Sequence, residues 1–130
     1  MNAATPSYPP SRNLLEGKSV VITAAAGTGI GFATAKRCLE EGASVLLSDW
    51  HERRLYEAVE QLNKAGHTAF GTVCDVTKED DVQNLFNSAE EKFGTIDIMV
   101  NNAGLGGQDN LVEMEDEQWF RVLDVTLNGT

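Results

Sequence analysis

The stretch from Val20 to Gly31 reads VVITAAAGTGIG, and it places the tightest limits on what this chain can fold into. A β-branched apolar run passes into small residues and glycines, and then into a helical pattern. This order is typical of the first βα unit of a nucleotide-binding domain, in which glycines let a pyrophosphate approach free N–H groups at a helix N-terminus. The glycines Gly27, Gly29 and Gly31 depart from G-x-G-x-x-G, with Phe32 where the third glycine would fall. The loop therefore needs support from the rest of the chain.

Strand-like and helix-like segments alternate along the rest of the sequence. Apolar runs at about 45–47, 68–73 and 96–100 predict further buried strands. Helical periodicity predicts helices from Ile30 to before Gly42, over 52–65, from a capping pair of Thr77 and Asp80 to Gly94, and over about 115–128. This alternation predicts an α/β fold, a Rossmann-type doubly wound parallel sheet in three α/β/α layers with strand order 3-2-1-4.

Composition limits the classes of partner. The 130 residues suffice for one domain, and we expect residues 1–13, which hold all three prolines, to be a flexible tail before a nucleotide-binding domain over 14–130. A net charge of −10 argues against nucleic acid and anionic membrane as partners, and no apolar run reaches the ~20 residues of a membrane span. Cys38 and Cys74 have no metal or disulfide spacing. We therefore expect no metal, and buried thiols in a reducing cytoplasm.

Two acidic residues follow predicted strands at the edge where such sheets bind ligands. A carboxylate at Asp49 can accept both hydroxyls of an adenosine ribose and would repel a 2′-phosphate, which favours NAD over NADP. The alternatives are that Asp49 caps the next helix, or that Arg53 or Arg54 swings back to pair a phosphate. Asp75 is placed to reach an adenine amino group or to fix the following turn.

The remaining residues that often carry chemistry have simpler interpretations. His51 and His67 have no partner spacing that suggests metal binding or base catalysis, so we expect both on the surface. We interpret Trp50 and Trp119 as packing residues and not as stacking platforms for a ligand.

The run Asn101-Asn102-Ala103-Gly104, after the fourth predicted strand, is the most specific motif of the chain. It follows the Thr23…Gly29-Ile30-Gly31 loop, Asp49 and Cys74-Asp75-Val76, and precedes Val122-Leu123-Asp124-Val125 with Leu127 and Gly129. In this order and spacing, residues 14–130 resemble the short-chain dehydrogenase/reductase family. The resemblance implies an NAD(P)-dependent oxidoreductase that transfers hydride between a nicotinamide and an alcohol or ketone. It implies these cofactor-binding residues: Thr23, Gly27, Gly29, Ile30, Gly31, Asp49, Asp75, Val76, Asn102 and Gly104.

The resemblance also assigns a role to each group of residues. The glycines and Ile30 would line the pyrophosphate, Asp49 the adenosine ribose, and Asp75 with Val76 the adenine. The family pattern places Asn102 and Gly104 beside the nicotinamide ribose, and lets Asn101 hold the central strands together.

Two departures from the family pattern lie within the site. Ala24 replaces the first glycine of T-G-x-x-x-G-x-G, and one residue is added before Gly29. We therefore expect a different first turn, with Gly27 supplying the lost conformational freedom. Thr126 stands where the family has a catalytic asparagine, whose main-chain carbonyl helps to hold a water in a proton relay. A threonine keeps that carbonyl, and its hydroxyl can bond one turn back and bend the helix.

The third departure concerns the family's Ser and Tyr-x-x-x-Lys, which lie beyond Thr130 in the family pattern. Neither Tyr8 nor Tyr56 is followed by a lysine four residues later. We therefore expect a domain that is incomplete at its C-terminus, an apolar fourth strand with an open edge, and no activity from these residues alone. The resemblance implies a homodimer or homotetramer in the cytoplasm.

Two other functions stay open at this point. One is a non-catalytic nucleotide-binding module, and the other is a related α/β enzyme such as a methyltransferase or a sugar-nucleotide epimerase. The alanine-rich loop resembles that of an actinobacterial branch associated with acyl-CoA or steroid breakdown.

Overall fold

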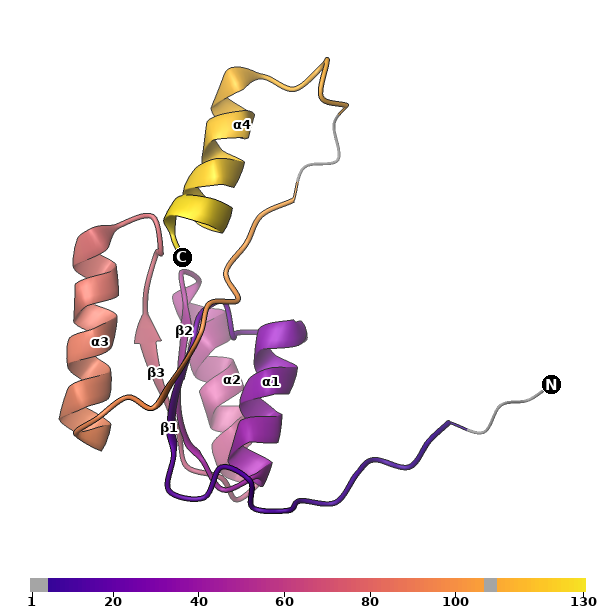
Figure 1. Ribbon diagram of the computed structural model, residues 1–130, viewed down its shortest axis with the longest axis vertical. Helices are drawn as coiled ribbons and strands as arrows, with labels where there is room; N and C mark the ends of the chain where they lie inside the picture. Colours follow the sequence, from indigo (N-terminus) through magenta and orange to yellow (C-terminus); the bar gives the residue numbers. More distant parts are fainter. Residues whose placement is uncertain (1–4, 107–109) are drawn as a thin grey trace.

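The structure, a computed structural model, describes residues 5–106 and 110–130. Its sheet contains β1 (Ser19–Ile22), β2 (Ser44–Asp49), β3 (Ala69–Val73) and β4 (Ile98–Val100). Its α-helices are α1 (Ile30–Glu40), α2 (Glu52–Lys64), α3 (Glu79–Phe93) and α4 (Asp116–Leu123). All neighbouring strands are parallel in the order β3-β2-β1-β4, which confirms the predicted topology (Figure 1). No helix in the described part of the chain is long and apolar enough to cross a bilayer.

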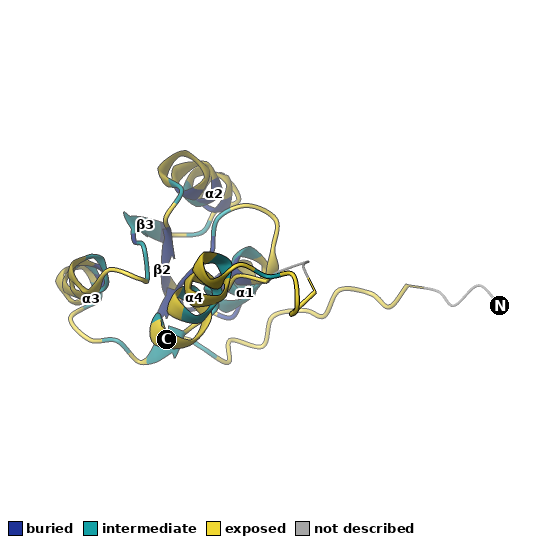
Figure 2. Ribbon diagram, turned by 90° about the horizontal axis from the view of Figure 1, so that it is seen from above, coloured by how far each residue is buried: buried dark blue, intermediate teal, exposed yellow. Residues whose placement is uncertain are grey.

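The sheet is covered on both faces, with α1 and α2 on one side and α3 on the other (Figure 2). Val20 and Val45 are paired in register and belong to the core shared with α1 and α2, whereas Val21 and Leu46 pack towards Leu85 of α3. Because side chains alternate between the faces of a strand, both sets of side chains in β1 and β2 are buried. This double burial explains the unbroken apolar runs that made the strands recognisable in the sequence.

The predicted capping pair at the start of α3 is wrong. The helix begins at Glu79, and its N-cap residue Lys78 makes no side-chain capping bond. The Thr77 hydroxyl donates to Asp75 Oδ1 at 2.7 Å, and it does not cap the free backbone N–H groups at the start of α3. Asp75, two residues earlier, binds this hydroxyl because the bond closes the turn directly after β3.

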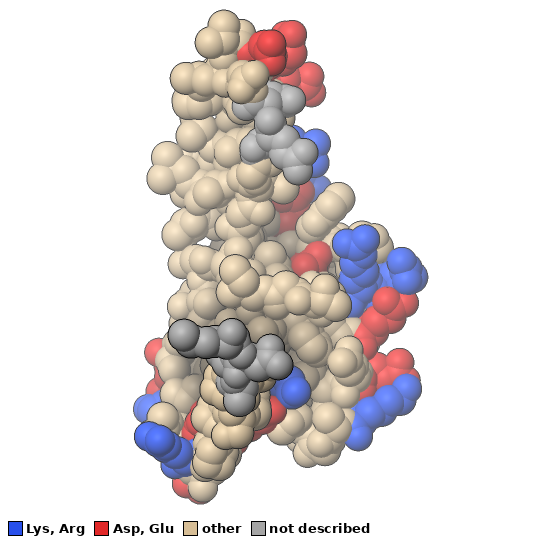
Figure 3. All heavy atoms as spheres, turned by 90° about the vertical axis from the view of Figure 1, so that its right-hand side faces the viewer, with Lys and Arg blue, Asp and Glu red and all other residues tan. Residues whose placement is uncertain are grey.

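The last predicted helix changes its hydrogen-bonding pattern partway. α4 ends at Leu123, and a π-helical turn follows over Asp124–Asn128. α4 has no buried residue and extends beyond the carboxyl ends of the strands (Figure 1). The surface around it is largely uncharged on the face shown in Figure 3. Large exposed apolar side chains on and near it are Leu111, Val112, Trp119, Phe120 and Leu127.

Residues 5–18, the described part of the segment before β1, form no helix or strand, but they contact the C-terminal half of α1. The Tyr8 hydroxyl donates to Glu40 Oε2 at 2.6 Å. The Arg37 guanidinium donates to the carbonyls of Pro9 and Pro10 at 2.8 and 3.1 Å. These contacts favour a fixed segment from Tyr8 onward. Residues 1–4 of the expected flexible tail lie outside the described residues, and the flexibility of the tail stays a prediction.

Glu41 is the second anchor of this segment and is only 4% exposed. Its carboxylate accepts the backbone N–H groups of Arg12 at 2.9 Å and Leu14 at 3.1 Å, and it pairs with Arg37. These donors, with the Arg12 N–H first, hold the pKa of Glu41 below its ordinary value. Charge-assisted bonds of this kind are stronger than neutral ones, so the carboxylate stabilises the fold in its ionised form.

We expect Glu41→Gln to lower the urea midpoint at pH 7, because the amide loses the charge that attracts these donors. A lowered pKa stabilises the folded state above the ordinary value of 4.5, and this contribution is lost as the pH falls through the folded pKa. The difference in urea midpoint between the variant and the wild type should therefore be large at pH 7 and should narrow as the pH falls below 4.5. Glu60→Gln, which breaks only an exposed pair with Lys64, is the control. An equal difference in urea midpoint at neutral and acid pH would contradict a stabilising role of the ionised Glu41 carboxylate.

Candidate functional site

The carboxyl ends of the four strands bring the expected site residues to one edge of the sheet. A cavity of about 640 Å³ opens there, within the range of small-molecule sites. Four of the expected cofactor-binding residues line it: Asp49, Asp75, Val76 and Gly104. Its other lining residues come from the strand ends and from the segment around α4: Ala24, Trp50, Cys74, Thr77, Ala103, Leu105, Glu117, Phe120, Arg121, Asp124 and Val125.

Asp49 is the buried acidic residue of this cavity, with 9% of its surface exposed. Its Oδ2 accepts the Ala26 N–H at 3.2 Å, and its Oδ1 accepts the His51 N–H at 2.9 Å. The N-cap residue of α2 is His51, so Asp49 fixes the turn into the helix but does not occupy the cap position. A carboxylate has about four lone-pair sites, and these two bonds leave acceptor capacity facing the cavity.

The first turn of the glycine-rich loop is made by an alanine. Ala24 has φ +50°, and Gly27 has φ +87°. Gly27 thus has the positive φ that its expected role requires, but it does not replace Ala24, because Ala24 itself also adopts the left-handed conformation. The Ala24 carbonyl accepts Asn102 Nδ2 at 3.1 Å, and the next N–H, of Ala25, donates to the Ser48 carbonyl at 2.9 Å. These two bonds hold the turn in a conformation that L-residues rarely adopt.

Two glycines of the loop have different surroundings. A Cβ on Gly31 would lie 2.5 Å from the Ala24 carbonyl oxygen and 2.6 Å from Asn102 Nδ2, so α1 approaches the loop too closely for any side chain. A Cβ on Gly29 would meet nothing within 4 Å. Gly29 is the N-cap of α1, and no side chain caps that helix. The first N–H groups of α1 therefore face open space, which is the arrangement that binds phosphate groups.

Asn102 and Thr23 tie the ends of β1 and β4 together. The N–H groups of Asn102 and Ala103 both donate to Thr23 Oγ1 at 3.0 Å. Asn102 Nδ2 also donates to the Thr23 carbonyl at 3.1 Å. The family resemblance assigned the holding of the central strands to Asn101, which is exposed; in the structure Asn102 makes these bonds. A direct contact of Thr23 or Asn102 with a cofactor stays a prediction.

Asp75 makes the contacts of a turn residue. Its Oδ1 accepts the Thr77 N–H at 3.1 Å and the Thr77 hydroxyl at 2.7 Å, and Lys78 Nζ lies 3.7 Å from its Oδ2. The Thr77 hydroxyl contributes most to holding the pKa of Asp75 below its ordinary value. Of the two roles considered for Asp75, these contacts belong to the one that fixes the turn.

Thr126 lies in the π-helical turn and bonds to a distant segment. Its hydroxyl accepts the Leu105 N–H at 3.0 Å and donates to the Leu105 carbonyl at 3.1 Å. The expectation of a hydroxyl bond one turn back along the helix is therefore wrong, because Leu105 offers a donor and an acceptor at once. The Thr126 carbonyl accepts the Thr130 hydroxyl at 3.3 Å. π turns often mark functional sites, and this one fastens the segment after Gly104.

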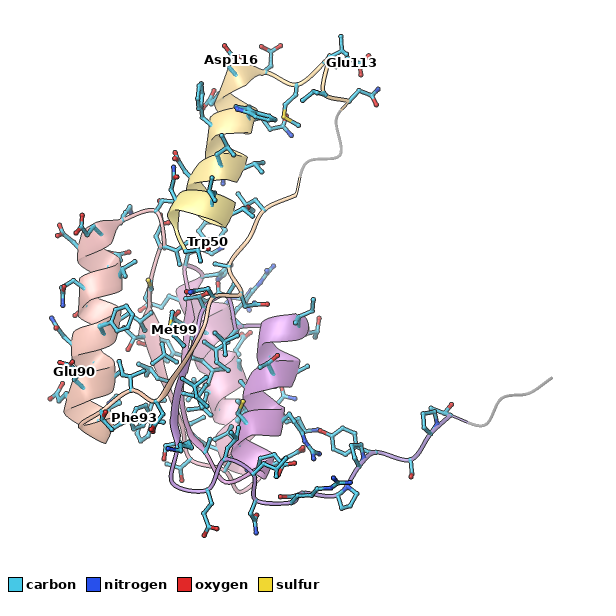
Figure 4. The ribbon with its side chains drawn as sticks, viewed as in Figure 1. Trp50, Glu90, Phe93, Met99, Glu113 and Asp116 are labelled. Carbon is cyan, nitrogen blue, oxygen red and sulfur yellow. The ribbon has the colours of Figure 1, made fainter. Side chains whose placement is uncertain are left out.

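The packing interpretation of Trp50 is wrong, and this residue was missed as part of the site. Trp50 is 70% exposed and lines the cavity directly after Asp49. Figure 4 shows it between the end of the sheet and the lower end of α4. Its position directly after β2, at the edge of the sheet where the cavity opens, was the signal for a cavity-lining residue. Trp119 is also exposed, at 45%, and lines a small hollow elsewhere with Leu111 and Met114.

The arginines that offered an alternative for phosphate binding do not line the cavity. Arg53 Nη1 lies 2.7 Å from Glu57 Oε1 one turn along α2, and both Arg53 and Arg54 are exposed. Among the described residues, no group of three or more His, Cys, Asp and Glu side chains is placed to hold a metal ion.

The left-handed turn at Ala24 leads to a stability prediction. We expect Ala24→Gly to raise the free energy of unfolding by about 0.5 kcal/mol, because glycine avoids a steric cost of about 1–2 kcal/mol but adds freedom to the unfolded chain. Ala25→Gly is the matched control, since Ala25 is fully buried and not left-handed, and it should lower the same quantity by about 1 kcal/mol. Urea unfolding measures both. Similar losses in the two variants would contradict the assignment.

Comparisons with known proteins agree with this geometry. A family model described as short chain dehydrogenase matches residues 18–130. A relative from Mycobacterium tuberculosis, (5R,7aS)-5-hydroxy-7a-methyl-1-oxo-2,3,5,6,7,7a-hexahydro-1H-indene-carboxyl-CoA reductase, is 53% identical over 117 residues, which are 89% of this chain and 45% of the relative. A 3beta-hydroxysteroid dehydrogenase from Mediterraneibacter gnavus is 38% identical over 113 residues, 86% of this chain and 41% of that protein.

Solved structures share the fold. The crystal structure of a short chain dehydrogenase from Mycobacterium smegmatis matches with a TM-score of 0.91 and 52% identity, over 95% of this chain and 51% of that one. A 3-ketoacyl-(acyl-carrier-protein) reductase from Brucella melitensis, complexed with NADH, matches with a TM-score of 0.81 and 36% identity, over 88% of this chain and 46% of that one. The chain thus spans about half the length of the relatives it matches. By its family match, its fold and its site, the chain belongs to the short-chain dehydrogenase/reductase family of oxidoreductases.

Proposed function

We propose that this chain is the cofactor-binding half of an NAD-dependent dehydrogenase that transfers hydride between the nicotinamide and an alcohol or ketone. The observation that carries the proposal is the position of Asp49. Its carboxylate is buried, is held by the N–H of Ala26 in the glycine-rich loop, and lines the cavity. When bound, the nicotinamide supplies the hydride chemistry of such a reaction.

The residues of the sheet edge fit a dinucleotide. The uncapped N-terminus of α1, with open space at Gly29, would hold the pyrophosphate together with Gly27, Ile30 and Gly31. Asp49 would accept the hydroxyls of the adenosine ribose.

Further residues complete this arrangement. Val76 would contact the adenine, with Asp75 fixing the turn behind it. Thr23, Asn102 and Gly104 would shape the nicotinamide side, where the Asn102 amide is already fixed by its own bonds.

The cofactor proposed is NAD, with NADP less well suited. A 2′-phosphate would face the carboxylate of Asp49, and Arg53, which could otherwise compensate, is paired with Glu57. The NADH named in the Brucella reductase structure supports the same choice.

We extend the proposal to the reaction of the whole protein. The relatives named as a CoA-thioester reductase and a 3beta-hydroxysteroid dehydrogenase support an acyl-CoA or steroid-type alcohol or ketone as the substrate. Thr126, at the family's asparagine position, would act through its main-chain carbonyl. The family's Tyr-x-x-x-Lys is not among these 130 residues, so we propose that they bind cofactor without turning over substrate.

Other features of the proposal come from composition and family. The family match favours an oxidoreductase over a non-catalytic nucleotide-binding module. We also propose a cytoplasmic homodimer or homotetramer, supported by the free thiols of Cys38 and Cys74 and by the exposed apolar side chains of α4.

Asp49→Ala tests the proposal. A charge-assisted bond contributes about 1.5–3 kcal/mol, so calorimetry should show NAD affinity falling by about tenfold or more. NADP affinity should stay the same or rise, because the repelling carboxylate is gone, so that the preference for NAD narrows. Asp116→Ala, at the exposed start of α4 and outside this cavity, is the control and should change neither affinity. An unchanged preference in Asp49→Ala would refute the role of Asp49.

A further inference from the structure

Trp50 is a large aromatic side chain left exposed where a buried strand ends. The two residues before it, Ser48 and Asp49, are 1% and 9% exposed, whereas Trp50 is 70% exposed. It lies in the wall of the cavity and not on the outer surface of a helix. Tryptophan gains much by burying its rings, so an exposed one in a cavity wall next to a ligand-binding carboxylate indicates a ligand-facing role.

The strand register places Trp50 beside the base-binding end of the cavity. Asp49 is paired with Val73 across β2 and β3, and the Cys74 N–H donates to the Asp49 carbonyl at 3.1 Å. The chain therefore leaves the sheet at neighbouring points after Asp49 and after Cys74. This brings Trp50 and Val76 into the walls of one cavity, together with the carboxylate proposed for the ribose.

Asp75, which the family resemblance places at the adenine, already has one of its two carboxylate oxygens engaged. Asp75 Oδ1 accepts two bonds from Thr77, and its Oδ2 faces Lys78 Nζ at 3.7 Å. An adenine amino group would therefore have to bond to Oδ2 and share that oxygen with the Lys78 ammonium group. Stacking on an indole needs no such bond, because every base has a π face.

We propose that Trp50 binds the adenine ring by stacking, and that this chain recognises the base by its aromatic face more than by its amino group. The inference rests on the proposed binding of NAD. If the proposal holds, the site should accept dinucleotides with bases other than adenine. A dinucleotide that carries hypoxanthine, which lacks the amino group, should bind nearly as well as NAD.

The test is calorimetric titration of the full chain with NAD and with nicotinamide hypoxanthine dinucleotide. The wild type should bind the two within about threefold of each other. Trp50→Ala should weaken both by about tenfold, and Trp50→Phe should retain most of the affinity because it keeps an aromatic face. Trp119→Ala is the matched control, since Trp119 is exposed but lines a different hollow, and it should bind like wild type. An unchanged melting temperature of Trp50→Ala shows that the variant is folded.

Two results would overturn this inference alone. One is NAD binding by Trp50→Ala that equals the wild type, and the other is a preference of the wild type for adenine over hypoxanthine of about tenfold or more. Wild-type protein that binds neither dinucleotide would overturn the proposed function together with this inference.

Discussion

The carboxyl edge of the sheet depends on the side-chain amide of Asn102. This amide donates to the carbonyls of Thr23 and Ala24, and so fixes the end of β1 against the end of β4. It also restricts the first turn of α1, because a Cβ on Gly31 would lie 2.6 Å from the amide nitrogen. The start of α1 is thus set by the same bonds that hold the left-handed turn at Ala24. The loop in turn donates to Asp49, so the phosphate-binding and ribose-binding ends of the proposed site share one anchor.

The fold could be predicted largely from patterning. Strands buried on both faces leave apolar runs such as Val45 to Leu47, and helices between them leave a period of about 3.6 residues. The features that could not be predicted are set by contacts distant in sequence. The π turn over Asp124–Asn128 brings Thr126 against Leu105, and no local pattern marks such a pair. The wrong cap at Thr77 is a local exception, because Asp75, two residues earlier, accepts the hydroxyl that the cap would have needed.

The site was predictable where a strand end determines position. Asp49 could be placed because it ends β2, at the edge where parallel sheets bind ligands. Trp50 was misinterpreted because an aromatic residue beside a buried strand looks the same in sequence whether it packs in a core or lines a cavity. The left-handed turn at Ala24 could not be predicted from the sequence either. Alanine rarely adopts that conformation, and only the surrounding bonds hold it there.

The most direct test of the central claim is to titrate NAD into isotope-labelled chain and follow the backbone amide signals by NMR. Binding at the proposed edge predicts saturable shifts at the uncapped amides of Ile30 and Gly31 and at Ala26, whose N–H contacts Asp49. The Ser19 N–H donates to Asp97 Oδ2 and the Asp97 N–H to Ser19 Oγ at the opposite edge of the sheet, and these two amide signals should stay unchanged. An absence of shifts, or shifts confined to that opposite edge, would contradict the account.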